Sequence, residues 1–236
     1  STDHPKSENA YDVFSLLLFS HFPYHKRFNF LQMPAENLHP TSSRLVSRED
    51  KEALWGQRGG VFWLCGLSGS GKSTLAIELE RELLKRRFSS IVLDGDNLRS
   101  TISKDLGFSE EDRAENLRRA SELARILVDN GSVVIVSFIT PLQSFRDQAK
   151  AIIGAENYFE VYVHASFETC RERDVKGLYA KADKGEIESF TGKHSPFEPP
   201  EKPWLAIDTE KETPDESSAR LLESVLNEIS PSQISG

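Results

Sequence analysis

Residues 66–74 read Gly66-Leu67-Ser68-Gly69-Ser70-Gly71-Lys72-Ser73-Thr74 and match the phosphate-binding pattern G-x-x-x-x-G-K-[ST] at every fixed position. The flanking sequence also fits, because residues 61–65 form a short apolar run and residues 74–84 have apolar side chains at helical spacing. Glycines let successive backbone N–H groups turn toward an anion, and a helix N-terminus adds partial positive charge. The sequence therefore predicts a site for a nucleoside triphosphate.

Different residues of this loop are expected to have different tasks. Lys72 would reach the β- and γ-phosphates, and the Ser73 hydroxyl would hold Mg²⁺. The alternative is a glycine-rich turn that binds nothing, but a chance match to four fixed positions is roughly a 1% event at average glycine content. The other members of the predicted phosphate site are Gly66, Ser68, Gly69, Ser70, Gly71 and Thr74.

Composition limits the class of protein. The 236 residues suffice for one α/β domain with a full core, and the net charge of −8 argues against a nonspecific nucleic-acid binder. Two cysteines, Cys65 and Cys170, make neither a disulfide framework nor a metal cluster and suit a reducing cytoplasm. No apolar run approaches the roughly 18 residues of a membrane span, so no membrane association is expected. The short run 13–19 follows acidic residues, unlike a signal peptide.

Apolar runs alternate with helical patterns from Gly60 onward, which predicts a parallel five-stranded sheet with helices on both faces. Ligands should then gather at the carboxyl ends of the strands. The predicted strands are residues 61–65, 90–93, 133–139, 159–164 and 205–208. The predicted helices are 47–55, 74–84, 98–102, 109–130, 143–153 and 214–229.

The chain is expected to divide into an extension, one domain and a short tail. Residues 1–44 have no sustained period, and the sole methionine, Met33, leaves open whether residues 1–32 are native. Residues 45–230 would form the domain and residues 231–236 the tail. Residues 171–203, between the fourth and fifth strands, are rich in charge, Gly and Pro; a connection of that length is typical of a lid.

Two carboxylates follow the second strand, Asp94 at its end and Asp96 two residues later. Beside a phosphate loop, one acid can orient metal-bound water while the other accepts the proton of an attacking hydroxyl. We expect Ser73 and Asp94 as the metal pair, although which acid contacts the metal stays open. The alternative is turn chemistry, in which Asp-Gly-Asp-Asn only caps the next helix.

A second anion site is predicted from cationic side chains. Arg99, Arg113 and Lys176 are the candidates, and Arg113 shares a helix face with Asn116. Each of them alone is more typical of an ordinary surface residue.

Other side chains of the polar loops have a weaker signal. Phe108 and Phe190 could stack on a base or simply pack. Arg171 and Arg173 open the lid segment and could stabilise charge on a transferring phosphoryl group. His164 and His194 are not spaced as metal ligands, and we assign them no role.

From about Met33 to Ile229 the chain resembles the adenylylsulfate kinases, which belong to the P-loop NTPase fold. The phosphate loop alone is generic, whereas the Asp-Gly-Asp-Asn, Arg-Asp-x-Lys-Gly-Leu-Tyr and Phe-Thr-Gly segments are far more specific. The matching segments are residues 66–74, 94–99, 106–109, 112–116, 138–141, 173–179 and 190–192.

The resemblance implies transfer of the γ-phosphoryl group of ATP to the ribose 3′-hydroxyl of adenylyl sulfate, with Mg²⁺. Residues 66–74, with Arg171 and Arg173, would bind ATP, and Lys72, Asp94, Asp96 and Lys176 would be catalytic. Phe108 and Phe190 would sandwich the adenine of the acceptor. The implied acceptor site comprises Asp96, Asn97, Arg99, Phe108, Arg113, Asn116, Ile139, Thr140, Lys176, Ser189 and Phe190.

One position departs from the family pattern, since Thr140 stands where the family often has a serine that has been labelled a phosphoenzyme intermediate. Threonine is stiffer at χ1, and direct in-line transfer needs no intermediate, so we expect Thr140 to contact substrate only. The family often forms homodimers, which these residues do not decide. No sulfurylase-like segment follows Ile229, which favours a stand-alone kinase.

Two other functions stay open. One is a related kinase of gluconate or of a nucleoside monophosphate, although gluconate offers no base for Phe108 and Phe190 to stack on. The other is a nucleotide-dependent switch, for which the Asn-Lys-x-Asp element of GTPases is absent from the sequence. A catalytically dead scaffold would lack acids near the loop, and Asp94 and Asp96 are both present.

Overall fold

The computed structural model describes residues 41, 44–186, 190–193 and 195–230. The chain divides into two units, Ser1–Leu45 and Val46–Gly236, and the elements below belong to the second. They are α2 (Arg48–Trp55), β1 (Gly60–Cys65), α3 (Lys72–Lys85), β2 (Ser90–Asp94), α4 (Gly95–Arg99), α5 (Glu110–Val128), β3 (Val133–Ser137), α6 (Gln143–Ile153), β4 (Tyr158–His164), α7 (Phe167–Arg173), α8 (Leu178–Asp183), β5 (Leu205–Asp208) and α9 (Pro214–Ile229).

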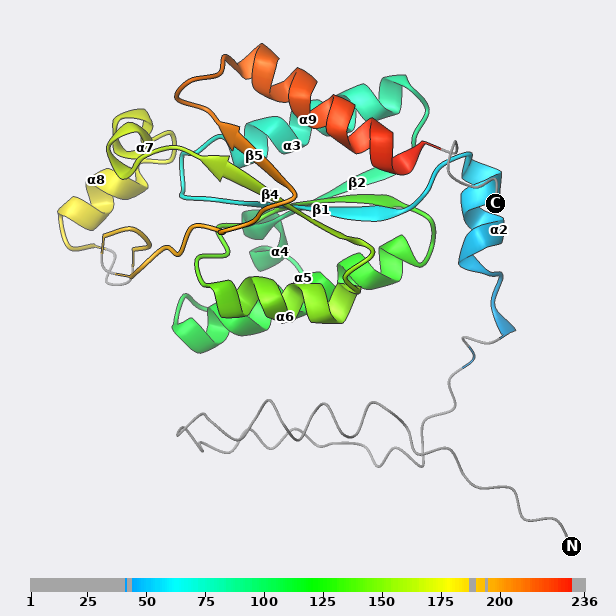
Figure 1. Cartoon of the computed structure of the whole chain (residues 1–236). Helices are drawn as coiled ribbons and strands as arrows, with labels where there is room; N and C mark the ends of the chain where they lie inside the picture. Colours follow the sequence, from blue (N-terminus) through cyan, green and yellow to red (C-terminus); the bar gives the residue numbers. More distant parts are fainter. Residues whose placement is uncertain (1–40, 42–43, 187–189, 194, 231–236) are drawn as a thin grey trace, which may run out of the picture. The chain divides into compact units, whose positions relative to one another are not determined.

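The five strands form one parallel sheet in the order β2-β3-β1-β4-β5, which confirms the predicted fold class (Figure 1). Every residue of the central strand β1 is buried, which explains its unbroken apolar run. Because all strands run the same way, the residues that follow β1, β2, β3, β4 and β5 meet at a single edge of the sheet. The phosphate loop follows β1 at this edge.

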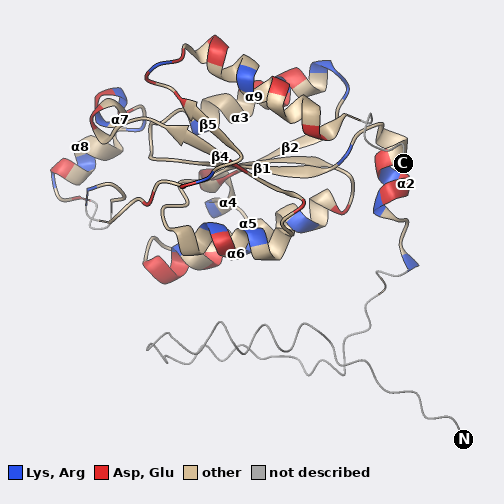
Figure 2. Cartoon of the chain, in the orientation of Figure 1, with Lys and Arg blue, Asp and Glu red and all other residues tan. Residues whose placement is uncertain are grey.

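Alternate side chains of the strands enter two cores. Trp63 and Val134 pack with α5 and α6 on one face, and Phe62 and Ile135 pack with α3 and α9 on the other (Figure 1). Lys, Arg, Asp and Glu are interspersed along the outward sides of these helices (Figure 2). Within the described part of the chain, no helix combines the length and the apolar character needed to cross a membrane.

Local signals set most of the helix ends. Ser47 caps α2 by accepting from the Asp50 N–H, and Thr213 and Glu216 form a reciprocal capping box at α9. At α5 only half of this arrangement forms. The Ser109 hydroxyl accepts from the Asp112 N–H at 3.1 Å, but the Asp112 carboxylate accepts from the Gly107 N–H instead.

The third strand and the helix after β2 both end earlier than predicted, and that helix also begins earlier, at Gly95. The third strand ends at Ser137, because the chain turns within three residues to place Thr140 at φ 44°. The helix after β2 ends at Arg99, where the hydroxyls of Ser100 and Thr101 both donate to the Asn97 carbonyl and compete with its helical hydrogen bond.

The connection between β4 and β5 contains α7, α8 and a small apolar cluster of its own, centred on Cys170, Tyr179 and Phe190. The sequence did not predict this packing, because the connection as a whole contains few apolar residues. Its role as a lid and the predicted domain boundaries stay predictions. The predicted extension and tail lie outside the described residues, apart from Thr41 and Arg44.

Candidate active site

The phosphate loop has a conformation that only glycine tolerates at its first position. Gly66 has φ 149°, and a Cβ there would lie 2.3 Å from the Val163 carbonyl oxygen. Its N–H donates to the Ile139 carbonyl at 3.2 Å, which ties the start of the loop to the segment after β3. Gly69 and Gly71 also have positive φ, at 81° and 103°. These conformations give the loop the curl expected of an anion site.

Lys72 begins α3 and is buried inside the loop, with only 7% of its surface exposed. Its Nζ donates to the Leu67 carbonyl at 2.7 Å. Burial lowers the pKa of Lys72 to about 8, because the ammonium group has lost most of its contact with water. A buried cation with one backbone acceptor is well prepared to bind an anionic group.

The predicted metal pair lies together at the sheet edge. Ser73 Oγ is 3.1 Å from Asp94 Oδ2 and 3.3 Å from the hydroxyl of Ser137, which pairs with Asp94 in the β2–β3 register. The other oxygen of Asp94 accepts from the Asp96 N–H at 3.0 Å and caps α4. The capping and metal-site interpretations of Asp94 are therefore compatible, since each uses one oxygen.

Asp96 meets the segment between α7 and α8. Its Oδ2 accepts from Lys176 Nζ at 2.5 Å, and both side chains are more than half exposed. The contact joins residues 80 positions apart in the chain. It places a carboxylate and an ammonium group together beyond the end of β2.

Arg99, Phe108 and Arg113 form one group. The Arg99 guanidinium carbon lies 4.6 Å above the centre of the Phe108 ring, which is 66% exposed. Arg113 Nε donates to the Phe108 carbonyl at 3.0 Å, and its Nη1 donates to Thr191 Oγ1 at 2.9 Å. Burial lowers the pKa of both arginines, with Arg113 adding to the effect at Arg99. Arg113 thus joins the Phe108 turn to the Phe190-Thr191 turn.

Other predicted acceptor residues lie on nearby elements. Asn116 is 2% exposed on α5, and its Oδ1 has no hydrogen-bond partner among the described residues. Asn97 is exposed on α4, and Ile139 is half-buried after β3. Thr140 is buried, and its hydroxyl accepts from Trp63 Nε1 at 2.9 Å. The Thr140 hydroxyl therefore lies against the core, where it is the acceptor in its bond with Trp63, and its own hydrogen can still be donated.

The site residues expected in the predicted lid, residues 171–203, differ in whether they contact the rest of the site. Phe190 is 7% exposed and packs edge-on against Tyr179, with ring centres 4.7 Å apart. Arg173 Nη1 lies 3.3 Å from the Gly69 carbonyl oxygen in the phosphate loop. Arg171 instead pairs with Asp183 of α8 at 2.7 Å, within the lid segment itself. Ser189 and His194 lie outside the described residues.

Sequence reasoning assigned no role to several residues that contact this site. Arg146 is 1% exposed; its Nη1 donates to the Thr140 carbonyl and its Nη2 to the Glu198 carbonyl. The sequence did not predict a role for Arg146, because a single arginine on an amphipathic helix is typical of a surface residue. Tyr179 belonged to a matched segment, and its hydroxyl donates to the Ser68 carbonyl at 2.8 Å. The family motif was the only signal for it.

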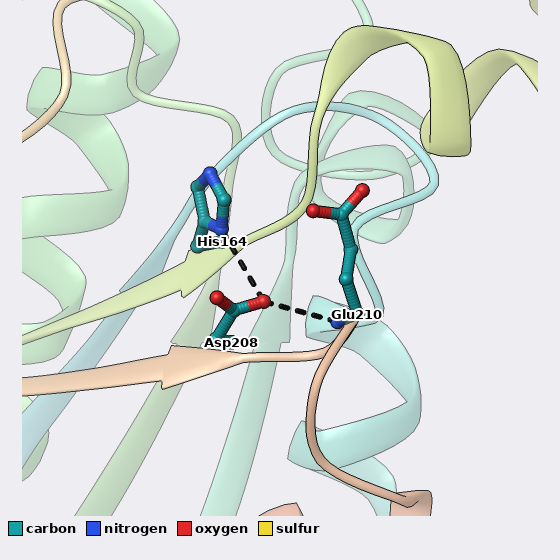
Figure 3. Close-up of side chains that lie close together, drawn as sticks. All are labelled: His164, Asp208 and Glu210. Carbon is teal, nitrogen blue, oxygen red and sulfur yellow. Dashed lines mark hydrogen bonds and ion pairs between the residues drawn. The ribbon is translucent and has the colours of Figure 1, made fainter.

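A histidine and two acids meet at the carboxyl ends of β4 and β5, although their spacing in the sequence does not predict it. His164 Nδ1 lies 3.4 Å from Asp208 Oδ1, and Glu210 lies beside them (Figure 3). Both carboxylates already have donors, since Asp208 pairs with Lys211 and Glu210 accepts from two hydroxyls. We therefore assign no metal to this cluster.

Fold and site together define a kinase with a phosphate loop on a parallel α/β sheet. A family model described as adenylylsulphate kinase matches residues 58–208. The chain belongs to the adenylylsulphate kinase family.

Relatives match over nearly their whole length. Adenylyl-sulfate kinase of Phocaeicola vulgatus is 54% identical over 194 residues, 82% of this chain and 95% of that protein. The enzyme of Bacteroides thetaiotaomicron is 53% identical over 193 residues, 82% of this chain and 96% of that protein. The solved structure of Mycobacterium tuberculosis APS kinase in complex with AMPPNP and APS is 45% identical, with a TM-score of 0.68 over 71% of this chain and 98% of that one.

Proposed function

We propose that the chain transfers the γ-phosphoryl group of ATP to the ribose 3′-hydroxyl of adenylyl sulfate, giving 3′-phosphoadenylyl sulfate. The observation that carries this proposal is the meeting of two pairs at one sheet edge. Ser73 of the phosphate loop meets Asp94 at the end of β2, and Asp96, two residues after Asp94, pairs with Lys176. The relatives at about half identity have the same activity in their names.

The loop residues 66–74 would bind the phosphates of ATP, with Lys72 on the β- and γ-phosphates. Ser73 and Asp94 would hold Mg²⁺, and their hydroxyl and carboxylate oxygens are ligands of the type that this ion prefers. The ion would neutralise charge that builds up between the β- and γ-phosphates. Arg173, which already lies at the loop, is a better candidate for the ATP side than Arg171, which pairs with Asp183.

On the acceptor side, Asp96 would orient the 3′-hydroxyl and accept its proton, and Lys176 would be displaced toward the phosphates. Arg99 and Arg113 would bind the phosphosulfate, with Phe108 and Phe190 against the adenine. Asn97, Asn116, Ile139, Thr140 and Ser189 would complete this site. We also propose a cytoplasmic location, consistent with two buried free thiols, and a homodimer as in many family members.

A coupled ADP-release assay tests the proposal, with adenylyl sulfate, gluconate and nucleoside monophosphates as acceptors. We expect turnover with adenylyl sulfate to exceed the others and the ATPase background. Turnover no faster than that background would overturn the assignment. A nucleotide-dependent switch would show no saturable binding of adenylyl sulfate, which isothermal titration calorimetry measures directly.

A further inference from the structure

Three consecutive carbonyl groups of the phosphate loop receive hydrogen bonds from side chains outside the loop. Tyr179 Oη donates to the Ser68 carbonyl at 2.8 Å, and Arg173 Nη1 donates to the Gly69 carbonyl at 3.3 Å. Thr209 Oγ1 lies 3.0 Å from the Ser70 carbonyl and 3.1 Å from the His164 carbonyl, so that its one hydrogen is shared between these two acceptors. We call these three side chains, Tyr179, Arg173 and Thr209, the outer brace.

Each planar peptide unit links a carbonyl group on the outer side of the loop to an N–H group on its inner side. In a trans peptide unit the C=O of one residue and the N–H of the next point in opposite directions, and no described peptide is cis. A donor that holds the Ser68 carbonyl outward therefore directs the Gly69 N–H inward. In the same way, a donor to the Ser70 carbonyl directs the Gly71 N–H inward.

The Gly69 and Gly71 N–H groups are among the amides of the loop that have no acceptor in the described structure, whereas the Ser70 N–H donates to the Leu67 carbonyl. Both residues are glycines with positive φ, a conformation that glycine adopts without strain. Neither has a side chain that could fix its peptide plane. Hydrogen bonds to the carbonyls of Ser68 and Ser70 therefore help to fix the orientation of these two N–H groups.

The brace is itself fixed by surrounding structure. Tyr179 is 3% exposed, and its ring packs edge-on against Phe167 and Phe190. Thr209 follows β5, and its carbonyl accepts from Arg173 Nη2 at 2.8 Å. Two separate segments, the one around α7 and α8 and the turn after β5, therefore hold the loop from outside.

We infer that Tyr179 and Thr209 are positioning residues, which orient the Gly69 and Gly71 amides toward the phosphates without touching the nucleotide through their hydroxyls. The inference rests on the proposed function for the identity of the anion, a nucleoside di- or triphosphate. It assigns part of the phosphate affinity to two hydroxyl groups on the far side of the loop.

Isosteric substitutions test it. Tyr179→Phe and Thr209→Val each remove one donor and keep the size of the side chain, while Thr209→Ser keeps the donor. We expect each of the first two to weaken ADP binding about fivefold, the range for loss of one neutral hydrogen bond, and to leave adenylyl sulfate binding unchanged. Thr209→Ser should bind ADP as the wild type does. Calorimetric titration with ADP and with adenylyl sulfate gives both dissociation constants.

Tyr158→Phe is the matched control, because it removes the same oxygen from a buried tyrosine of β4 that packs against Trp63. It should leave ADP affinity unchanged. Unchanged ADP affinity in both Tyr179→Phe and Thr209→Val, or equal weakening of ADP and adenylyl sulfate, would overturn the inference. Failure of the wild type to bind ADP would instead overturn the proposed function.

Discussion

The phosphate loop is partly buried and hydrogen-bonded on its outer side, whereas Asp96 and Lys176 of the acceptor side are exposed and held by one ion pair between distant segments. Lys72 and Ser70 are buried in the loop, and its outer carbonyls are bonded to Tyr179 and Thr209. Asp96 and Lys176, in contrast, pair with more than half of each side chain in water. Exposed pairs of this kind are commonly worth about 0–1 kcal/mol.

This difference suggests a preformed nucleotide site and an acceptor site that adjusts on binding. Substitutions inside the loop, at Lys72 or Gly66, should change catalysis or folding strongly. Breaking contacts on the acceptor side should change one ligand's affinity and leave the fold intact.

The largest effect is expected for Lys72→Ala. The buried ammonium bonds only the Leu67 carbonyl in the described structure, so its loss should not unfold the protein. Loss of a charge positioned at the transferring phosphoryl group should lower kcat by about a thousandfold. Steady-state kinetics with ATP and adenylyl sulfate measure this, and thermal unfolding reports the fold. Lys85→Ala, an exposed lysine in the last turn of the same helix, is the control and should keep wild-type kcat. Wild-type turnover in Lys72→Ala would exclude the loop from the chemistry.

A pair of glycine substitutions compares the rigidity of the two regions. In Gly66→Ala, the new Cβ would lie 2.3 Å from the Val163 carbonyl oxygen, so overpacking adds to backbone strain. We expect a loss of about 3 kcal/mol or more in the free energy of unfolding. In Gly177→Ala, at φ 65° with nothing within 4 Å, only the left-handed backbone is strained, at about 1 kcal/mol. Urea denaturation of both variants gives the two values, and equal losses would contradict a rigid loop beside an adaptable segment between α7 and α8.

The sheet was predictable because β1 and β3 contain continuous apolar runs, residues 61–65 and 133–136, and the other strands are mostly apolar. The Ser73–Asp94 pair was predictable too, since a phosphate loop and the end of another strand of the same parallel sheet share one edge. Both inferences use only local pattern and the direction of parallel strands.

The brace around the loop was not predictable from pattern. Tyr179 contacts a residue 111 positions away and Thr209 one 139 positions away. Which carbonyl each hydroxyl meets depends on how α7 and α8 pack, and a charged segment of low apolar content gives no periodic signal for that packing. For the same reason, sequence placed Arg171 and Arg173 together, although only Arg173 lies at the loop.

On the acceptor side, Arg113→Ala should weaken one ligand selectively. Arg113 joins the Phe108 carbonyl to Thr191, and a charge-assisted bond to an anionic acceptor is worth about 1.5–3 kcal/mol. Adenylyl sulfate should therefore bind about ten- to a hundredfold more weakly, with ADP affinity unchanged. Calorimetric titrations with each ligand check this. Arg118→Ala removes an arginine from the same helix that pairs with Glu115 and serves as control. Similar losses for both ligands would make Arg113 structural.

The smallest effect is a pH dependence that originates at Lys72. Burial lowers its pKa to about 8, so the free protein loses this charge above that pH, and ADP should bind about tenfold more weakly at pH 9 than at pH 7. Stability should move the other way. Between pH 8 and the ordinary lysine value the unfolded chain holds more protons than the folded one, so Lys72 makes the free energy of unfolding of the nucleotide-free protein rise with pH. Lys72→Met, neutral and of similar length, should flatten both trends. ADP titrations and urea denaturation from pH 7 to pH 10 measure them, and a slope that persists in Lys72→Met would place the titrating group elsewhere.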